Sequence, residues 1–484
     1  MYIKTEGQLI LPSDFFLPFG GKLNNTNRWI TLASLVPWGR VEALYAKSFK
    51  KSLKGQKALS IRVALGALII QERCQLDDRE TVLQIMENPY LQYFIGLAGY
   101  QESAPFHHSL LTHFRKRLTP EIIQQVNEWI AIAAAKDTDE QNPPHDDHPE
   151  DGPSQRKKTM NSEAIASSEG SNQGTLLLDA TCTPADIAYP TDLTLLNEAR
   201  EKLEGIIDVL HAPHAGTLIK PRTYREKARK AYLQVTKQRR MGKSKLRKAI
   251  GKQLAYVARN LRHVEQLQAK TSLTVLKRKQ YKDLLVISEL YRQQRIMYTS
   301  RSHQVDDRIV NIHQPHVRPI VRGKAKAKVE FGAKVAMSLV NGYALMEKVS
   351  WDNFNEGTTL IASAETYKAR FGYYPKEILA DQIYRNRDNI AFCKANGIRL
   401  SGPKLGRPSK EDSLVEQKRL TYQDSCDRNA IEGKFGEGKR RYGLGRIRAR
   451  LVNTSETMIS LQLLVMNLER KLRLFVVFFF NFFK

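Results

Sequence analysis

The stretch that decides the fold class reads Ser425-Cys-Asp-Arg-Asn-Ala-Ile-Glu-Gly-Lys-Phe-Gly-Glu-Gly-Lys439. It places Glu432 four residues, and Lys439 eleven residues, after Arg428. At about 100° of rotation per helical residue, these offsets return to within about 40° and 20° of the starting direction. A helix here would carry one carboxylate and two cations on a single stripe. Such a stripe suits a metal-binding acid beside cations that grip phosphates; the alternative is a solvated face with an incidental ion pair.

Charge and composition bound the class of partner. The chain has 484 residues and a net charge of +27, and its pI is near 9.8. Such an excess of Lys and Arg indicates a polyanionic partner, most simply double-stranded DNA. An anionic membrane surface is the second possibility, but no lipidation motif is present and no run reaches the roughly 18 apolar residues of a membrane span.

The cysteines and the N-terminus bear on the compartment. Cys74, Cys182, Cys393 and Cys426 are scattered and form no Cys-x-x-Cys pair. This spacing fits reduced cysteines better than a zinc site or a disulfide framework. The first residues, Met-Tyr-Ile-Lys-Thr-Glu, show no signal-peptide pattern. We therefore expect a cytoplasmic protein.

Residues 1–135 read as several short helices that close on the basic cluster Arg115, Lys116 and Arg117. This pattern favours a helical DNA-binding domain related to helix-turn-helix readers. An all-helical interaction domain with a basic rim is the alternative. Three nearby histidines (His107, His108 and His113) lack Cys or carboxylate partners at ligand spacing, so we expect no metal site there.

The segment 136–174 changes character. It is acidic and Pro-rich at first, and then rich in Ser, Asn and Gly. Such a composition is typical of a disordered linker.

The next segment predicts a buried strand. Leu176-Leu-Leu-Asp-Ala-Thr181 is an apolar run that presents Asp179 at its end. Taken alone, an Asp at this place is as often a turn or cap residue as a catalyst.

Residues 193–304 form a long helical block. Apolar residues from Leu246 to Val264 recur at alternating steps of three and four, as in a helical hairpin or coiled coil. Residues 220–252 hold fourteen Lys and Arg and a single acid, Glu226. Like charges at helical spacing repel, so this run favours binding to a phosphate backbone over a merely solvated face.

Beyond residue 305 the pattern turns to alternating strands and helices. Asn341-Gly342 separates two apolar runs and predicts a hairpin. Glu377-Ile-Leu-Ala-Asp381 is a short strand ending on Asp381, and helices follow on both sides. Such alternation predicts an α/β core with a mixed sheet.

The predicted organisation has an all-α N-terminal domain, a linker, a catalytic core split by an insertion, and a C-terminal helix with an apolar tail. These parts span 1–135, 136–174, 175–192 with 305–450, 193–304, and 451–484, respectively.

Acids that end strands converge at one edge of such a sheet. Three carboxylates from Asp179, Asp381 and Glu432 would repel one another unless cations joined them. Two Mg²⁺ or Mn²⁺ ions would offset this repulsion. Oxygen-only ligands fit these ions better than they fit zinc. Three unrelated acids, with Asp179 and Asp381 as strand-end caps, are the alternative.

Three blocks together resemble bacterial insertion-sequence DDE transposases of insertion-sequence family five. Arg428, Glu432 and Lys439 fit the Y-x2-R-x3-E-x6-K signature of that family, with Ser425 at the Tyr position. The Asp179 and Asp381 segments look like its other two catalytic blocks. In the N-terminal region, Asn88-Pro-Tyr-Leu-Gln-Tyr-Phe-Ile-Gly-Leu97 is similar to the helical region of such transposases.

The resemblance implies an RNase H-like core that cuts and rejoins transposon-end DNA. It implies that Asp179, Asp381 and Glu432 hold the two metal ions, that Arg428 and Lys439 contact phosphates, and that two copies act as a homodimer. Glu437 is the rival third acid. A non-catalytic DNA-binding protein and an RNase H-like nuclease that only hydrolyses are the alternative functions.

Overall fold

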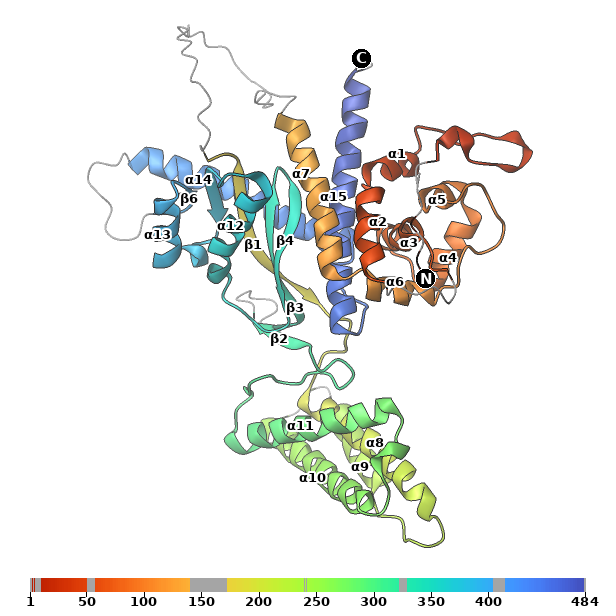
Figure 1. Cartoon of the computed structure of the whole chain (residues 1–484). Helices are drawn as coiled ribbons and strands as arrows, with labels where there is room; N and C mark the ends of the chain where they lie inside the picture. Colours follow the sequence, from red (N-terminus) through yellow and green to blue (C-terminus); the bar gives the residue numbers. More distant parts are fainter. Residues whose placement is uncertain are drawn as a thin grey trace.

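The computed structural model describes residues 2, 4, 10–49, 57–139, 172–238, 240, 242–321, 329–403 and 414–482. Over these residues the protein is mixed α/β, with more helix than strand. Figure 1 shows N-terminal helices packed beside a long C-terminal helix, a sheet next to them, and a helical body set apart at one end of the sheet. Most of the predicted linker, 140–171, lies outside the described residues.

The N-terminal region is helical, as the sequence predicts. Polar side chains accept hydrogen bonds from first-turn amides: Asn27 caps α1, Ser60 caps α3 and Asp77 caps α4. Two short 3₁₀ turns, Pro12–Asp14 and Pro18–Gly20, come first. The helices are α1 (Arg28–Leu35), α2 (Trp38–Lys47), α3 (Ile61–Cys74), α4 (Asp78–Glu87), α5 (Pro89–Phe94), α6 (Leu110–Arg117) and α7 (Pro120–Asp139).

One mixed sheet lies at the centre. Its path is β2-β3-β1-β5-β6, and β4 pairs with β3 off this path. β1 runs antiparallel to β3 and parallel to β5. The predicted hairpin is confirmed: β3 and β4 pair through a turn at Asn341 and Gly342, both with positive φ. The strands are β1 (Thr175–Pro184), β2 (Arg318–Val321), β3 (Val329–Val340), β4 (Tyr343–Ser350), β5 (Glu377–Ala380) and β6 (Arg399–Leu400).

Helices cover both faces of the sheet. Leu176 and Leu178 of β1 pack in a cluster with α12 (Leu360–Phe371) and α13 (Arg387–Ala395). Leu177 lies on the other face and packs against the cluster that includes α14 (Leu414–Arg441) and α15 (Val452–Phe482). Because side chains alternate along a strand, Asp179 shares the face of Leu177 and points toward α14.

The N-terminal helices share one hydrophobic cluster with the sheet and α15. Buried amides join the three parts. The Nδ2 of Asn127 on α7 donates to the carbonyl oxygen of Ala344 at 3.0 Å, and that of Asn467 on α15 donates to Asn127 Oδ1 at 2.8 Å. The backbone amide of Ala344 donates to Asn467 Oδ1 at 2.9 Å. The N-terminal helices are therefore docked against the sheet by both apolar and polar contacts.

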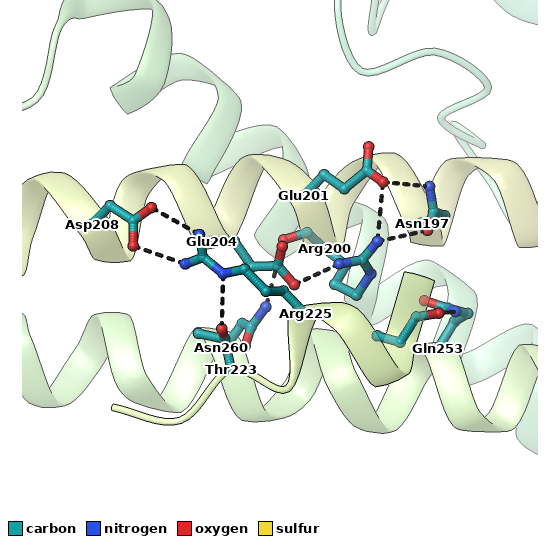
Figure 2. A network of polar contacts seen from close by, with 10 residues as sticks. Asn197, Arg200, Glu201, Glu204, Asp208, Thr223, Arg225, Gln253 and Asn260 are labelled. Carbon is teal, nitrogen blue, oxygen red and sulfur yellow. Dashed lines mark hydrogen bonds and ion pairs between the residues drawn. The ribbon is translucent and has the colours of Figure 1, made fainter. Parts of the chain in front are cut away.

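The helical body between β1 and β2 has its own hydrophobic cluster, drawn from residues 195–312. Inside it, the buried Arg200 donates to Asn197 at 2.8 Å and to Glu204 at 2.5 Å (Figure 2). Of the predicted stripe, Val257 is buried whereas Leu246 is 37% exposed. The helices are α8 (Asp192–His211), α9 (Arg225–Thr236), α10 (Lys243–Gln268) and α11 (Arg278–Ser300).

The apolar C-terminal segment continues α15, and Leu474, Phe475 and Val476 are 41–48% exposed. Among the described residues, none of the helices has both the length and the apolar character needed to cross a bilayer.

Candidate functional site

A pocket of about 840 Å³ lies at the edge of the sheet, next to α14. Asp179, Asp381 and Glu432 all line it, although about 250 residues separate the first from the last. Arg428 and Lys439 line the same pocket. The structure therefore brings together all five residues that the sequence assigned to catalysis and to phosphate contact at this site.

The pairing of β1 with β5 explains why two of the acids meet. Their last parallel pair joins Leu178 to Ala380, and Asp179 and Asp381 are the next residues on the two strands. The prediction that Asp179 ends its strand is wrong, because β1 continues to Pro184. The cause is the long antiparallel partner β3, which keeps pairing with β1 after β5 has ended.

The helix α14 supplies the third acid and the cations. Residues 414–441 are helical despite the glycines at 433, 436 and 438, so Arg428, Glu432 and Lys439 share a stripe as predicted. Ile431 and Phe435 are buried in the main hydrophobic cluster and fix the rotation of the helix against β1.

Arg428 lies between two of the carboxylates. Its Nη1 is 3.6 Å from a carboxylate oxygen of Asp381, and its Nη2 is 3.7 Å from one of Glu432. The acid side chains are 57% and 56% exposed, whereas that of Arg428 is 23% exposed. The cation is thus the more fixed partner, and the acids can turn around it.

Asp179 is the least solvated of the three acids. Burial raises the pKa of its carboxyl group to about 6, against a weaker opposing hydrogen bond from the Ala180 amide. The negative charges of Glu356 and Glu432 raise this pKa further, and Arg428 lowers it. A carboxylate in this position gains from a nearby cation, because a cation offsets both the burial and the repulsion.

Two charged residues that line the pocket were not predicted from the sequence: Glu356 and Lys334. Lys334 is buried on β3, and its Nζ donates to Glu356 Oε1 at 2.9 Å and to the carbonyl oxygen of Phe354 at 2.8 Å. One signal could have found them. A lysine inside the apolar run of β3 needs a carboxylate partner, and Glu356 is the first acid after Asp352 in the loop that follows the hairpin.

The donor chemistry of the pocket fits a hard divalent cation. Four carboxylates line it, including Glu356, and oxygen-only donors suit Mg²⁺ or Mn²⁺. Among the described residues, no three His, Cys, Asp or Glu side chains stand close enough together to share one ion. The exposed acids Asp381 and Glu432 would therefore have to turn away from Arg428 toward Asp179 in order to hold a metal.

Glu437, the rival third acid, does not line the pocket. Its carboxylate accepts from Lys434 at 3.0 Å and from Arg473 at 2.8 Å, which ties α14 to α15. The geometry therefore favours Glu432 over Glu437.

The basic cluster of α6 lies elsewhere. Arg115 forms a bidentate pair with Asp78, at 2.9 and 2.7 Å, and also donates to Gln71. The Arg117 guanidinium lies over the Phe49 ring at 4.1 Å, and Lys116 is exposed. Of these three predicted DNA contacts, Arg115 already pairs with Asp78 and Gln71 within the fold, whereas Lys116 is exposed to solvent.

Two family models match the chain. Residues 378–469 match the family described as Transposase DDE domain, and residues 18–117 match the family described as Transposase domain (DUF772). The first segment contains Asp381, Arg428, Glu432 and Lys439. These matches support an insertion-sequence transposase, which is a DNA-processing enzyme.

One curated protein is also similar. It is described as "Uncharacterized protein ORF8 in nfe locus" from Rhizobium meliloti, and it is 26% identical over 181 residues. The alignment covers 37% of this chain and 73% of that protein. No solved structure matches the chain.

Proposed function

We propose that the protein is a DDE transposase that cuts transposon-end DNA and joins it to a target by phosphoryl transfer on an RNase H-like core. The observation that carries this proposal is the shared pocket of Asp179, Asp381 and Glu432. Residues far apart in the chain supply these acids, and Arg428 and Lys439 flank them. The family matches give the same class of enzyme.

Each residue of the pocket has a role in this proposal. Asp179, Asp381 and Glu432 hold two Mg²⁺ or Mn²⁺ ions, which when bound would activate water and stabilise the leaving oxygen. Arg428 and Lys439 bind the phosphates on either side of the cut. In a complex with DNA, Arg428 would give up its contacts with Asp381 and Glu432 and bind a phosphate instead.

The other parts of the chain serve this chemistry. We assign 175–192 and 305–450 to the catalytic core, 1–135 to DNA binding and 136–174 to a linker. The insertion 193–304 and the C-terminal 451–484 complete the chain. The substrate is double-stranded DNA, the active species is a homodimer because two ends must be cut together, and the protein acts in the bacterial cytoplasm at the nucleoid.

The test uses the DNA that flanks the gene, Mg²⁺ and the full-length protein. Asp179→Asn should lower end cleavage by about 10²–10³-fold or more, because it removes the carboxylate whose burial and acidic neighbours favour a bound cation. Glu432→Gln should do the same, and Glu437→Gln, which changes an acid outside the pocket, should keep activity. Equal activity of wild type and Asp179→Asn would overturn the proposal.

A pre-cut end separates the alternative functions. With a free 3′-hydroxyl supplied on the element end, a transposase forms joined strands in a target plasmid. A nuclease would only shorten the DNA, and a non-catalytic DNA-binding protein would bind the DNA without changing it.

A further inference from the structure

A groove of about 220 Å³ separates α9 from α10 in the helical insertion. Three lysines of α10 line it: Lys245, Lys248 and Lys252. They are three and four residues apart, so they project from one face of the helix. Tyr232 of α9 and Gln238, two residues after the end of that helix, also line the groove.

The groove carries charge of one sign only. Among the residues that the structure describes, no carboxylate lines it. None of the three lysines forms an ion pair with another residue that the structure describes, and all three are exposed. The neighbouring Lys220 and Arg225, by contrast, both pair with Asp208 at 2.8 Å. The insertion can therefore supply acids to cations, and it leaves these three without one.

The lysines do not serve the fold. The insertion is held by its own apolar cluster and by the buried contacts of Arg200 shown in Figure 2. Lysines three and four residues apart on one helix face repel by about 0.2–0.5 kcal/mol per pair. An arrangement that weakens the isolated helix, and that faces a groove, points to an anionic ligand that fills it.

The groove is close to the catalytic pocket along the chain. Leu193, at the start of α8, lines the groove, and Cys182 of β1 lines the pocket. The eleven residue steps from Cys182 to Leu193 span at most about 40 Å even when the chain is fully extended. At about 3.4 Å per base-pair step, this limit corresponds to roughly 12 base pairs of duplex.

We propose that the groove formed by Lys245, Lys248 and Lys252 is a phosphate-backbone site for duplex DNA, lying within about one helical turn of the cut. The binding is independent of base sequence, because lysines that reach phosphates carry no base readout. Its position relative to the cut rests on the proposed function; the DNA binding itself does not.

The test compares two triple variants of the full-length protein with equal loss of charge. The first is Lys245→Gln/Lys248→Gln/Lys252→Gln. The control is Lys270→Gln/Lys279→Gln/Lys282→Gln, three exposed lysines of the same insertion that do not line the groove. Circular dichroism and thermal melting establish that both variants fold. Affinity for a 30-base-pair duplex is measured against salt concentration, without divalent metal.

Each phosphate contact contributes about 0.9 to the slope of log K against log salt. The groove variant should lose about 2.7 of that slope, and the control variant less than about 1. Equal slope changes in the two variants would overturn the proposal, because only net charge would then matter. It would also be overturned if the groove variant lost binding to RNA hairpins or to anionic vesicles but kept its slope for the duplex.

A footprint locates the site. On an element-end duplex, wild type should protect backbone within about 12 base pairs of the cut that the groove variant leaves exposed. If the two variants differ in salt slope but the wild-type protein never cleaves DNA, the proposed transposase function is refuted and the groove assignment stands. A protein that cleaves while both variants behave alike would do the reverse.

Discussion

Two basic clusters look alike in the sequence and differ in the structure. Arg115, in the cluster at the end of α6, donates hydrogen bonds from its guanidinium to Asp78 and Gln71. Lys245 and Lys248, in the groove of the insertion, face solvent and have no described acid beside them. Both runs raise the net charge equally, yet the groove presents three adjacent cations to a ligand whereas α6 has already lost one of its three.

The difference arises from what lies beneath each cluster. Under α6 there are acids of α3 and α4, namely the buried Glu72 and the partly buried Asp78, and Asp78 would lose its bidentate partner if the arginine left. Under α10 there is an apolar cluster and a neutral glutamine, Gln253. A basic run therefore predicts a nucleic-acid surface only where its cations do not pair with an acid of a neighbouring helix.

The largest expected effect concerns Arg115. Arg115→Met should lower the free energy of unfolding by about 3 kcal/mol, because it leaves the partly buried Asp78 without its bidentate partner. The salt dependence of DNA binding should stay unchanged. Urea denaturation and the duplex titration measure the two quantities. The exposed neighbour is the control: Lys116→Met should alter stability by less than about 0.5 kcal/mol.

If Arg115→Met instead left stability intact and flattened the salt dependence, Arg115 would be a DNA contact after all, and the contrast between the two clusters would disappear.

The second effect tests the buried acid on the same side of the comparison. Burial raises the pKa of Glu72 to about 7, despite a hydrogen bond from Gln462 and the charges of Arg115 and Arg448. The unfolded chain releases this proton near its ordinary pKa of 4.5, so stability falls as pH rises from 4.5 through 7. Glu72→Gln cannot ionise, and should be about 3 kcal/mol more stable than wild type at pH 8.

Below pH 4.5 the two proteins should have equal stability, since Glu72 is then protonated in both the folded and the unfolded state. Thermal melts from pH 4 to pH 8 give the comparison. A constant difference over this range would show that packing, and not the proton, separates the two proteins.

The smallest expected effect is on the insertion. Asp208→Asn releases Lys220 and Arg225 from their shared carboxylate. All three side chains are 37–50% exposed, so the loss of stability should stay below about 1 kcal/mol. Two freed cations at the start of α9, the helix whose other end lines the groove, should tighten duplex binding about two- to fivefold at low salt. Unchanged affinity would place the bound backbone away from this end of α9.

Much of the fold could be predicted from short stretches of the sequence. The Asn341-Gly342 turn, the cap at Asp77 and the stripe from Arg428 to Lys439 each follow from a few neighbouring residues, and the structure has all three. The extent of β1 does not follow from local sequence, because its pairing beyond Asp179 depends on β3, about 150 residues later.

The electrostatic partners were harder to predict for the same reason. The pairing of Arg115 with Asp78 joins residues 37 positions apart, and that of Lys334 with Glu356 joins a strand to a loop beyond its hairpin. An acid or base shows its charge in the sequence, but its partner is set by which helix packs on which strand. The acids of the pocket could be predicted from the sequence because the strand or helix around each acid could be recognised separately.

The two separate apolar clusters have a consequence for how the chain can change over generations. The N-terminal helices are part of the interior that supports the sheet, so deleting them would strip one face of the catalytic core. In the part of the chain that the structure describes, the insertion encloses its own interior and is connected to the sheet through the segments that follow β1 and precede β2. We therefore expect homologous chains to replace or drop this body wholesale, while every one of them keeps the helices that precede β1.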